Sequence, residues 1–175
     1  MDKYIWIFPV LFILHDMEEV IWLPGFIEKN REDIIKQYPI AEKLLSVYKM
    51  GMTTEAFALA VYEELIVLMA ICVLVELTKA ELAMGIWYGA LIGFTAHLVI
   101  HILQSIAIKR YIPSLITSIL TLLPSIMLLM HTKWDMGLSA IIGTIIGIAG
   151  VAANLKLAHM LMNWYMKRRK ITWHR

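Results

Sequence analysis

Cysteine, charge and the motifs of soluble enzymes are scarce in this sequence. The single cysteine, Cys72, excludes an intrachain disulfide and a metal site built from cysteines. Charged residues make up only 17% of the 175 residues, whereas apolar residues make up 60% and the mean hydropathy is +0.71. A chain of this length cannot bury so much apolar surface within itself, so we expect lipid to be its solvent.

Other absences narrow the function classes. The sequence has no phosphate-binding glycine loop, no Ser–His–Asp order and no haem signature. A net charge of +2 gives no reason to expect a nucleic-acid partner. The first apolar segment is not followed by a small-residue cleavage pattern, so we expect it to be a retained helix rather than a signal peptide.

Five apolar segments approach the ~20 residues that a membrane-spanning helix needs. They cover residues 4–26, 53–77, 82–108, 113–130 and 137–164. We therefore predict an all-α fold, a polytopic membrane bundle of five transmembrane helices that forms one domain over residues 1–175. The charged segment 28–49 contains Pro39 and is amphipathic after it, which predicts one short interfacial helix between the first two spans.

Basic residues predict the orientation of the bundle in a cell membrane. The tail from Lys167 to Lys170 reads KRRK, and such a run marks the cytoplasmic side. Five spans then place Lys109, Arg110 and the basic residues of 28–49 on the same side. The sequence predicts a multi-pass protein with its N-terminus outside and its C-terminus in the cytoplasm.

Four of the five segments carry polar residues that a simple membrane anchor would not contain. They are His15, Asp16, Glu18 and Glu19 in the first segment, Glu63 and Glu64 in the second, His97 and His101 in the third, and Asn154 and His159 in the fifth. The fourth segment has no charged residue. Under the predicted orientation the polar residues all lie roughly 8–17 Å from the cytoplasmic end of their spans, which places them in one layer.

Spacing brings these side chains onto shared helix faces. His15, Glu18 and Glu19 stand at i, i+3 and i+4, and His97 and His101 stand at i and i+4. Glu63 and Glu64 are adjacent and point about 100° apart, so spacing leaves open which of them faces the same centre.

Charge predicts a bound cation in this layer. Four glutamates within a bilayer cost on the order of 10 kcal/mol before compensation. Carboxylates with neutral imidazoles suit zinc or iron, so we expect one or two divalent metal ions; a network that holds only protons is the alternative. The expected metal ligands are His15, Glu18, Glu19, Glu64, His97, His101 and His159. Glu63, Glu64 and His159 are also the expected catalytic residues, as general base or further ligands.

Small residues form two ridges with a four-residue period. One contains Gly85, Gly89 and Gly93, and the other contains Ser139, Gly143 and Gly147. Such ridges let helix backbones approach closely in lipid, and we interpret them as packing seams.

The stretch from His15 to Glu19 reads H-x-x-E-E. With the later Glu and His residues of the spans, the chain resembles the HXXEE-domain family of small bacterial integral membrane proteins from His15 to about His159. It departs from the family's Asn-x-x-x-His pattern, because Asn154 and His159 are five residues apart. The resemblance supports the choice of site residues and implies no particular reaction.

Three functions fit these observations. The first is a metal-dependent membrane enzyme that acts on a lipophilic or lipid-linked substrate, by hydrolysis or by oxidation, with membrane lipid as its surroundings. The alternative is a cation or proton transporter that uses the same carboxylates and histidines, although no inverted repeat is present and the outer halves of the spans are apolar. The third is a structural subunit, for which so many carboxylates would be a costly means of holding helices together. The sequence does not indicate an oligomeric state.

Overall fold

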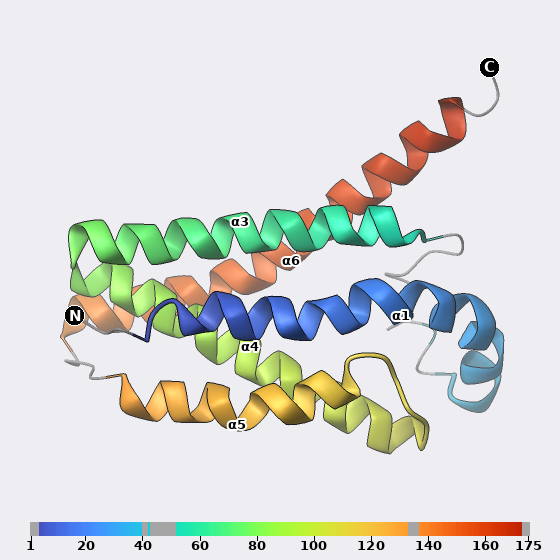
Figure 1. Cartoon of the computed structure of the whole chain (residues 1–175), viewed down its shortest axis with the longest axis horizontal. Helices are drawn as coiled ribbons and strands as arrows, with labels where there is room; N and C mark the ends of the chain where they lie inside the picture. The colour runs from blue at the N-terminus through green and yellow to red at the C-terminus, as the bar shows by residue number, and fades with distance from the viewer. Residues whose placement is uncertain (1–3, 40–41, 43–51, 133–136, 173–175) are drawn as a thin grey trace.

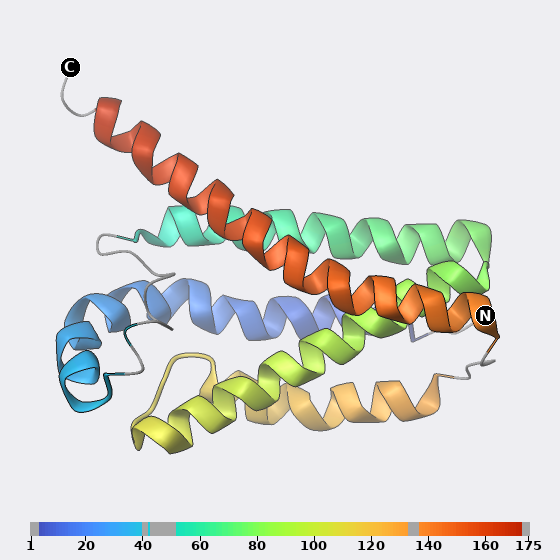
Figure 2. The same ribbon diagram turned by 180° about the vertical axis from the view of Figure 1, so that it is seen from behind.

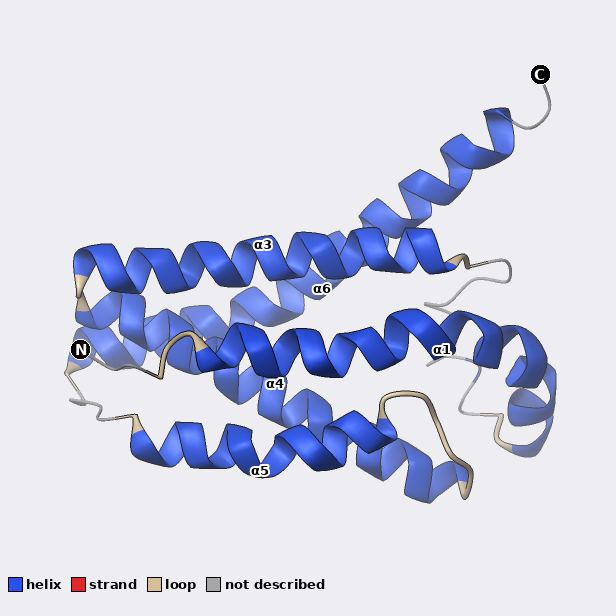
Figure 3. Ribbon diagram, viewed as in Figure 1, coloured by secondary structure: helices blue, strands red, loops and turns tan. Residues whose placement is uncertain are grey.

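The computed structural model describes residues 4–39, 42, 52–132 and 137–172, and within these ranges the chain consists of helices joined by short turns and loops (Figures 1 and 3). The helices are α1 (Ile7–Gln37), α3 (Thr54–Thr78), α4 (Glu81–Ile108), α5 (Leu115–His131) and α6 (Leu138–Thr172). The described residues contain no strand. The all-α class predicted from the sequence is therefore confirmed.

Two helices are longer than the apolar segments that predict them. Helix α1 continues past Phe26 to Gln37 through a charged stretch of good helix formers, and its last turns bend away from the bundle (Figure 1). It thus includes the start of the segment 28–49 that is predicted as an interfacial helix, and residues 40–41 and 43–49 of that segment lie outside the described residues. Helix α6 runs past Trp164 to Thr172 and projects beyond the other helices (Figures 1 and 2).

Three helices, α3, α4 and α6, are long and apolar enough to cross a membrane. Helix α5 is apolar but has only 17 residues. Helix α1 carries Asp16, Glu18 and Glu19, and all three of these acidic side chains are buried. The other helices surround these three side chains, whereas the charged residues nearer the end of α1, such as Glu28 and Glu32, are exposed.

Helices α4 and α6 pack along the predicted glycines of both ridges (Figure 2). Ser139 of the second ridge is exposed, and the neighbouring Ala140 lies in the seam instead. A Cβ atom added at Gly85 would collide with the backbone carbonyl of Ala140, and one added at Gly147 would collide with that of Ile86. Thr144 Oγ1 lies 3.3 Å from the carbonyl oxygen of Gly85 and hydrogen-bonds to it across the seam. Only small residues permit this backbone contact.

Aromatic packing sets the register between α1 and α4. Phe8 packs edge-on against Trp87 with ring centroids 5.9 Å apart, and it also contacts Phe94 at 5.4 Å. The Trp87 indole N–H donates to the carbonyl oxygen of Ile5 at 3.3 Å. Further along α1, Phe12 and then His15 also contact Phe94, with ring centroids 6.1 and 5.8 Å apart. This register places His15 beside the histidines of α4.

Candidate metal centre

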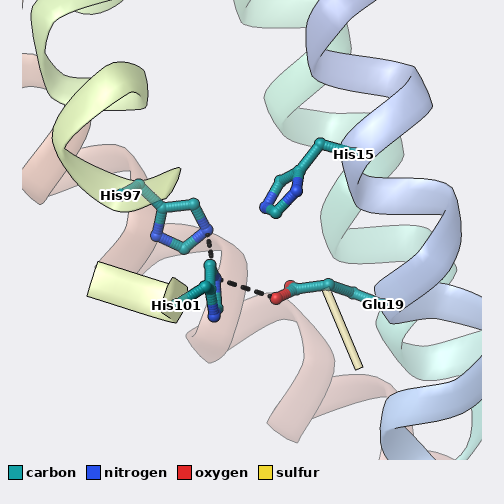
Figure 4. Close-up of side chains that lie close together, drawn as sticks. All are labelled: His15, Glu19, His97 and His101. Carbon is teal, nitrogen blue, oxygen red and sulfur yellow. Dashed lines mark hydrogen bonds and ion pairs between the residues drawn. The ribbon is translucent and has the colours of Figure 1, made fainter. Parts of the chain in front are cut away.

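Helices α1 and α4 bring three imidazoles and one carboxylate together inside the bundle. His15 and Glu19 project from α1, and His97 and His101 project from α4 (Figure 4). One ligand atom from each residue lies within 4.8 Å of the others. Each helix contributes two residues four positions apart, so helix geometry aligns each pair and packing of the two helices brings the pairs together.

The shortest contacts converge on His101. Its Nε2 atom lies 2.8 Å from Nε2 of His97 and 3.0 Å from Oε1 of Glu19 (Figure 4). Ligand atoms around a tetrahedral zinc ion lie roughly 3.3 Å apart, given metal–nitrogen bonds of about 2.0–2.1 Å. Two ring nitrogens at 2.8 Å repel each other unless a proton or a cation lies between them, because their lone pairs face each other. The 2.8 Å separation is that of a hydrogen bond through one shared proton, and a modest separation of the two rings would make room for a metal ion in its place.

Burial makes unpaired polar atoms in this cluster costly. His15 is 0% exposed and Glu19 is 4% exposed. Nε2 of His15 and Oε1 of Glu19 have no hydrogen-bond partner, since the approach of His101 to Glu19 is close but is not aligned as a hydrogen bond. A metal ion bound by both atoms would remove this penalty.

Thr117 of α5 fixes the tautomer of His15. The Thr117 hydroxyl donates its only proton to Oε2 of Glu18 at 2.6 Å, so it can only accept from Nδ1 of His15, which lies 3.2 Å away. Nδ1 then carries the ring proton, and Nε2 presents a lone pair to the cluster. Histidine ligands in metal sites are held in this way by a hydrogen bond to the other ring nitrogen.

Glu18, a predicted metal ligand, points away from the four-residue cluster. Its carboxylate accepts hydrogen bonds from the Thr117 backbone N–H at 2.8 Å, from the Thr117 hydroxyl and from the Tyr111 hydroxyl at 2.5 Å. The N–H groups at the start of α5 have no partner within that helix, and they attract a carboxylate. Partial burial and the bond to Glu18 raise the pKa of Tyr111 to about 12, so this tyrosine remains a donor.

Asp16 and Glu64 lie beside the cluster rather than in it. Both line a cavity of about 410 Å³, together with His97 and Asn154. Asp16 is close enough to Glu19 and Glu64 for electrostatic repulsion. Glu63 instead lies next to the side chain of Asn154. Of the two adjacent glutamates, Glu64 is the one that lines this cavity.

His159, another predicted ligand, is not among the four clustered residues. Its Nδ1 atom lies 2.6 Å from the carbonyl oxygen of Leu155, one turn earlier on α6. His159 was predicted as a ligand from its distance to the cytoplasmic end of its span. That distance does not determine the direction in which the side chain points.

The structure thus brings together His15, Glu19, His97 and His101 of the predicted metal ligands, and it places Glu18, Glu64 and His159 elsewhere. The sequence did not predict the roles of Thr117, which hydrogen-bonds to His15 of the cluster, or of Tyr111, which donates to the neighbouring Glu18. Thr117 lies in the fourth apolar segment, 113–130, and Tyr111 lies just before it. A threonine among apolar residues does not by itself indicate a contact with a metal ligand.

The fold and the cluster define a class of protein: a helical bundle with span-capable helices and an interior group of imidazoles and carboxylate. The chain belongs to the family described as "Protein of unknown function with HXXEE motif", which it matches over residues 6–129. The match includes all four clustered residues and Thr117, and it ends before α6. No significant similarity was found to any curated protein or to any solved structure.

Proposed function

We propose that this protein is a multi-pass membrane enzyme that binds one divalent transition metal through His15, Glu19, His97 and His101. The observation that carries the proposal is the convergence of four buried or half-buried ligand atoms within 4.8 Å, two of them without a hydrogen-bond partner. One ion is proposed rather than two, because the described residues contain one such group.

The five described helices form the proposed transmembrane bundle, with the N-terminus outside the cell and the C-terminus in the cytoplasm. The apolar lengths of α3, α4 and α6 support this placement. The acidic residues Asp16, Glu18 and Glu19 of α1 are buried by the other helices, so they need not face lipid. The basic C-terminal end of α6 supports the orientation.

Zinc and ferrous iron both suit three imidazoles and one carboxylate. A bound zinc ion would polarise a carbonyl group or activate water for hydrolysis, whereas iron would support oxidation with O₂ as the oxidant. His97 lines the 410 Å³ cavity, so a molecule in the cavity would lie against the cluster. Glu64 and Asp16 line the same cavity and are positioned to accept a proton.

Elemental analysis of the purified protein tests the proposal. Wild type is compared with the double variant His97→Ala, His101→Ala, after size-exclusion chromatography and circular dichroism have established that both are folded. The matched control is His131→Ala, because this histidine lies at the far end of α5 and bonds to the carbonyl oxygen of Met127 in its own helix. We expect about one equivalent of a single metal in wild type and control, and loss of that metal in the double variant.

Two results would overturn the proposal. One is folded wild-type protein that takes up no zinc or iron when either ion is supplied. The other is a folded double variant that retains a full equivalent, because the metal would then be bound elsewhere.

A further inference from the structure

The cavity beside the cluster is lined by four helices, α1, α3, α4 and α6. Each helix contributes one polar residue to the lining, and these are Asp16, Glu64, His97 and Asn154. Most of the remaining lining residues are aliphatic or aromatic. The positions of the polar residues therefore decide what the cavity can bind.

The polar residues gather at one end of the cavity. Helices α1, α4 and α6 run in one general direction and α3 runs back (Figures 1 and 2). On α1, Asp16 comes two turns after Phe8, and on α4 His97 comes three turns after Ile86. On the reversed helix α3, Glu64 comes two turns before Ile71. The opposite end of the cavity is apolar.

The apolar part has the dimension of a lipid chain. Eight residues separate Phe8 from Asp16 on α1, and the same number separates Ile146 from Asn154 on α6. At 1.5 Å per residue these segments are about 12 Å long. One leaflet of hydrocarbon is about 15 Å thick, so these segments extend along most of the length of a lipid chain in one leaflet.

The border of the cavity is exposed on the side of α3 and α6. Val67 is 36% exposed and Ile146 is 47% exposed, whereas Phe8 and Phe94 on the opposite wall are 3% and 5% exposed. Exposed aliphatic residues of these helices would face lipid in the proposed bundle. A chain could therefore enter sideways from the bilayer.

Charge selects the head group. Among the described residues that line the cavity, none is lysine or arginine. Two carboxyl groups, those of Asp16 and Glu64, line it instead. An anionic head group would therefore find no cationic side chain in the lining, while a hydrogen-bond donor would find carboxyl oxygens that can accept.

We propose that the cavity binds one single-chain lipid whose head group donates a hydrogen bond and carries no negative charge, such as a long-chain alcohol or amine. The chain lies between Phe8 and Ile146, and the head group lies against Asp16, Glu64 and His97. The proposal names the substrate class of the enzyme proposed above and rests on that function. Fatty acids and anionic phospholipids should bind less well, because the lining offers carboxyl groups and no cationic side chain to their charged groups.

Photoaffinity labelling in lipid nanodiscs tests the proposal on the full chain. The probe is a long-chain alcohol with a diazirine in its chain, and mass spectrometry maps the labelled peptides. Dodecanol, dodecylamine and dodecanoate then compete with the probe. We expect labelling of the α3 and α6 segments that line the cavity, with competition by dodecanol and dodecylamine and little competition by dodecanoate.

Gly150→Leu supplies a variant that fills the border of the cavity. Gly150 lines the cavity, and a Cβ atom added there meets nothing within 4 Å. Gly25→Leu is the matched control, because it is equally free of contacts and does not line the cavity. We expect labelling to fall about tenfold or more in Gly150→Leu alone, since added bulk displaces the chain. In Glu64→Gln, which removes one negative charge, dodecanoate should compete better than in wild type.

The outcomes separate this proposal from the metal proposal. Metal content is measured in every variant, and Gly150→Leu should retain its metal. Normal metal content with labelling that dodecanoate displaces as well as dodecanol would overturn the proposed head-group selectivity. Equal labelling of Gly150→Leu and wild type would overturn the proposed site, whatever the metal content.

Discussion

Replacement of Thr117 by valine removes one hydroxyl and leaves the shape of the side chain almost unchanged. In the wild type this hydroxyl accepts the Nδ1 proton of His15 and donates to Glu18. In Thr117→Val the ring proton of His15 loses its acceptor in a site that is 0% exposed. The ring is then free to change tautomer or to turn, and either change removes Nε2 from the cluster.

The expected loss of metal affinity follows from this geometry. Partners that hold a ligating histidine contribute about 10–100-fold to metal affinity. That range corresponds to roughly 1.4–2.7 kcal/mol of binding free energy. We expect the zinc Kd of Thr117→Val to rise by a factor in this range while the stoichiometry stays at one. Thr117→Ser should restore most of the affinity, because it restores the hydroxyl.

The assay is a zinc competition titration against a chromogenic chelator at fixed pH, with the protein in nanodiscs. Thr121→Val is the matched control, since Thr121 is the same residue type one turn along α5 and its hydroxyl donates to the Thr117 carbonyl oxygen at 2.7 Å. The control should bind zinc as wild type does. If Thr117→Val binds zinc within about twofold of Thr121→Val, the inferred role of Thr117 in holding His15 is wrong.

Further predictions concern Glu19 and its neighbour Glu18, the α4–α6 seam, and the bond between Tyr111 and Glu18. The variant Glu19→Gln should lose most of its zinc affinity, because the substitution removes the charge of a proposed ligand. The variant Glu18→Gln should still bind one equivalent of zinc, and its thermal unfolding midpoint should fall because the hydrogen bond that caps α5 is weaker. Gly147→Leu should abolish the folded bundle, judged by size-exclusion chromatography, because its Cβ meets the backbone of α4; a normal elution profile would contradict the α4–α6 seam. The pKa of Tyr111 is about 12 in the folded protein and about 10 in the unfolded chain, so the folded state holds this proton more tightly. The resulting contribution to the free energy of unfolding is fully present below about pH 10 and is lost as the pH rises through about 12. Tyr111→Phe should therefore flatten the loss of stability between pH 10 and 12, and an unchanged alkaline denaturation curve would count against the Tyr111–Glu18 bond.

The sequence by itself determined the helices and the pairing of side chains along each of them. Long apolar runs can satisfy their backbone hydrogen bonds only within a helix if lipid surrounds them, so α3, α4 and α6 could be predicted from composition alone. The pairs His15 with Glu19 and His97 with His101 were equally predictable. A separation of four residues places two side chains on one helix face, whatever the rest of the fold does.

Only the tertiary structure decided which side chains meet across helices. Glu18 and Glu19 differ by one position and point about 100° apart. Packing turns Glu19 toward α4 and its histidines, whereas Glu18 meets the start of α5. The same angle between neighbouring residues separates Glu64, which lines the cavity, from Glu63, which does not line it. Sequence spacing gives the angle between neighbours on a helix, but the rotation of each helix about its axis depends on contacts with distant segments, such as Trp87 with Ile5 and Thr117 with His15.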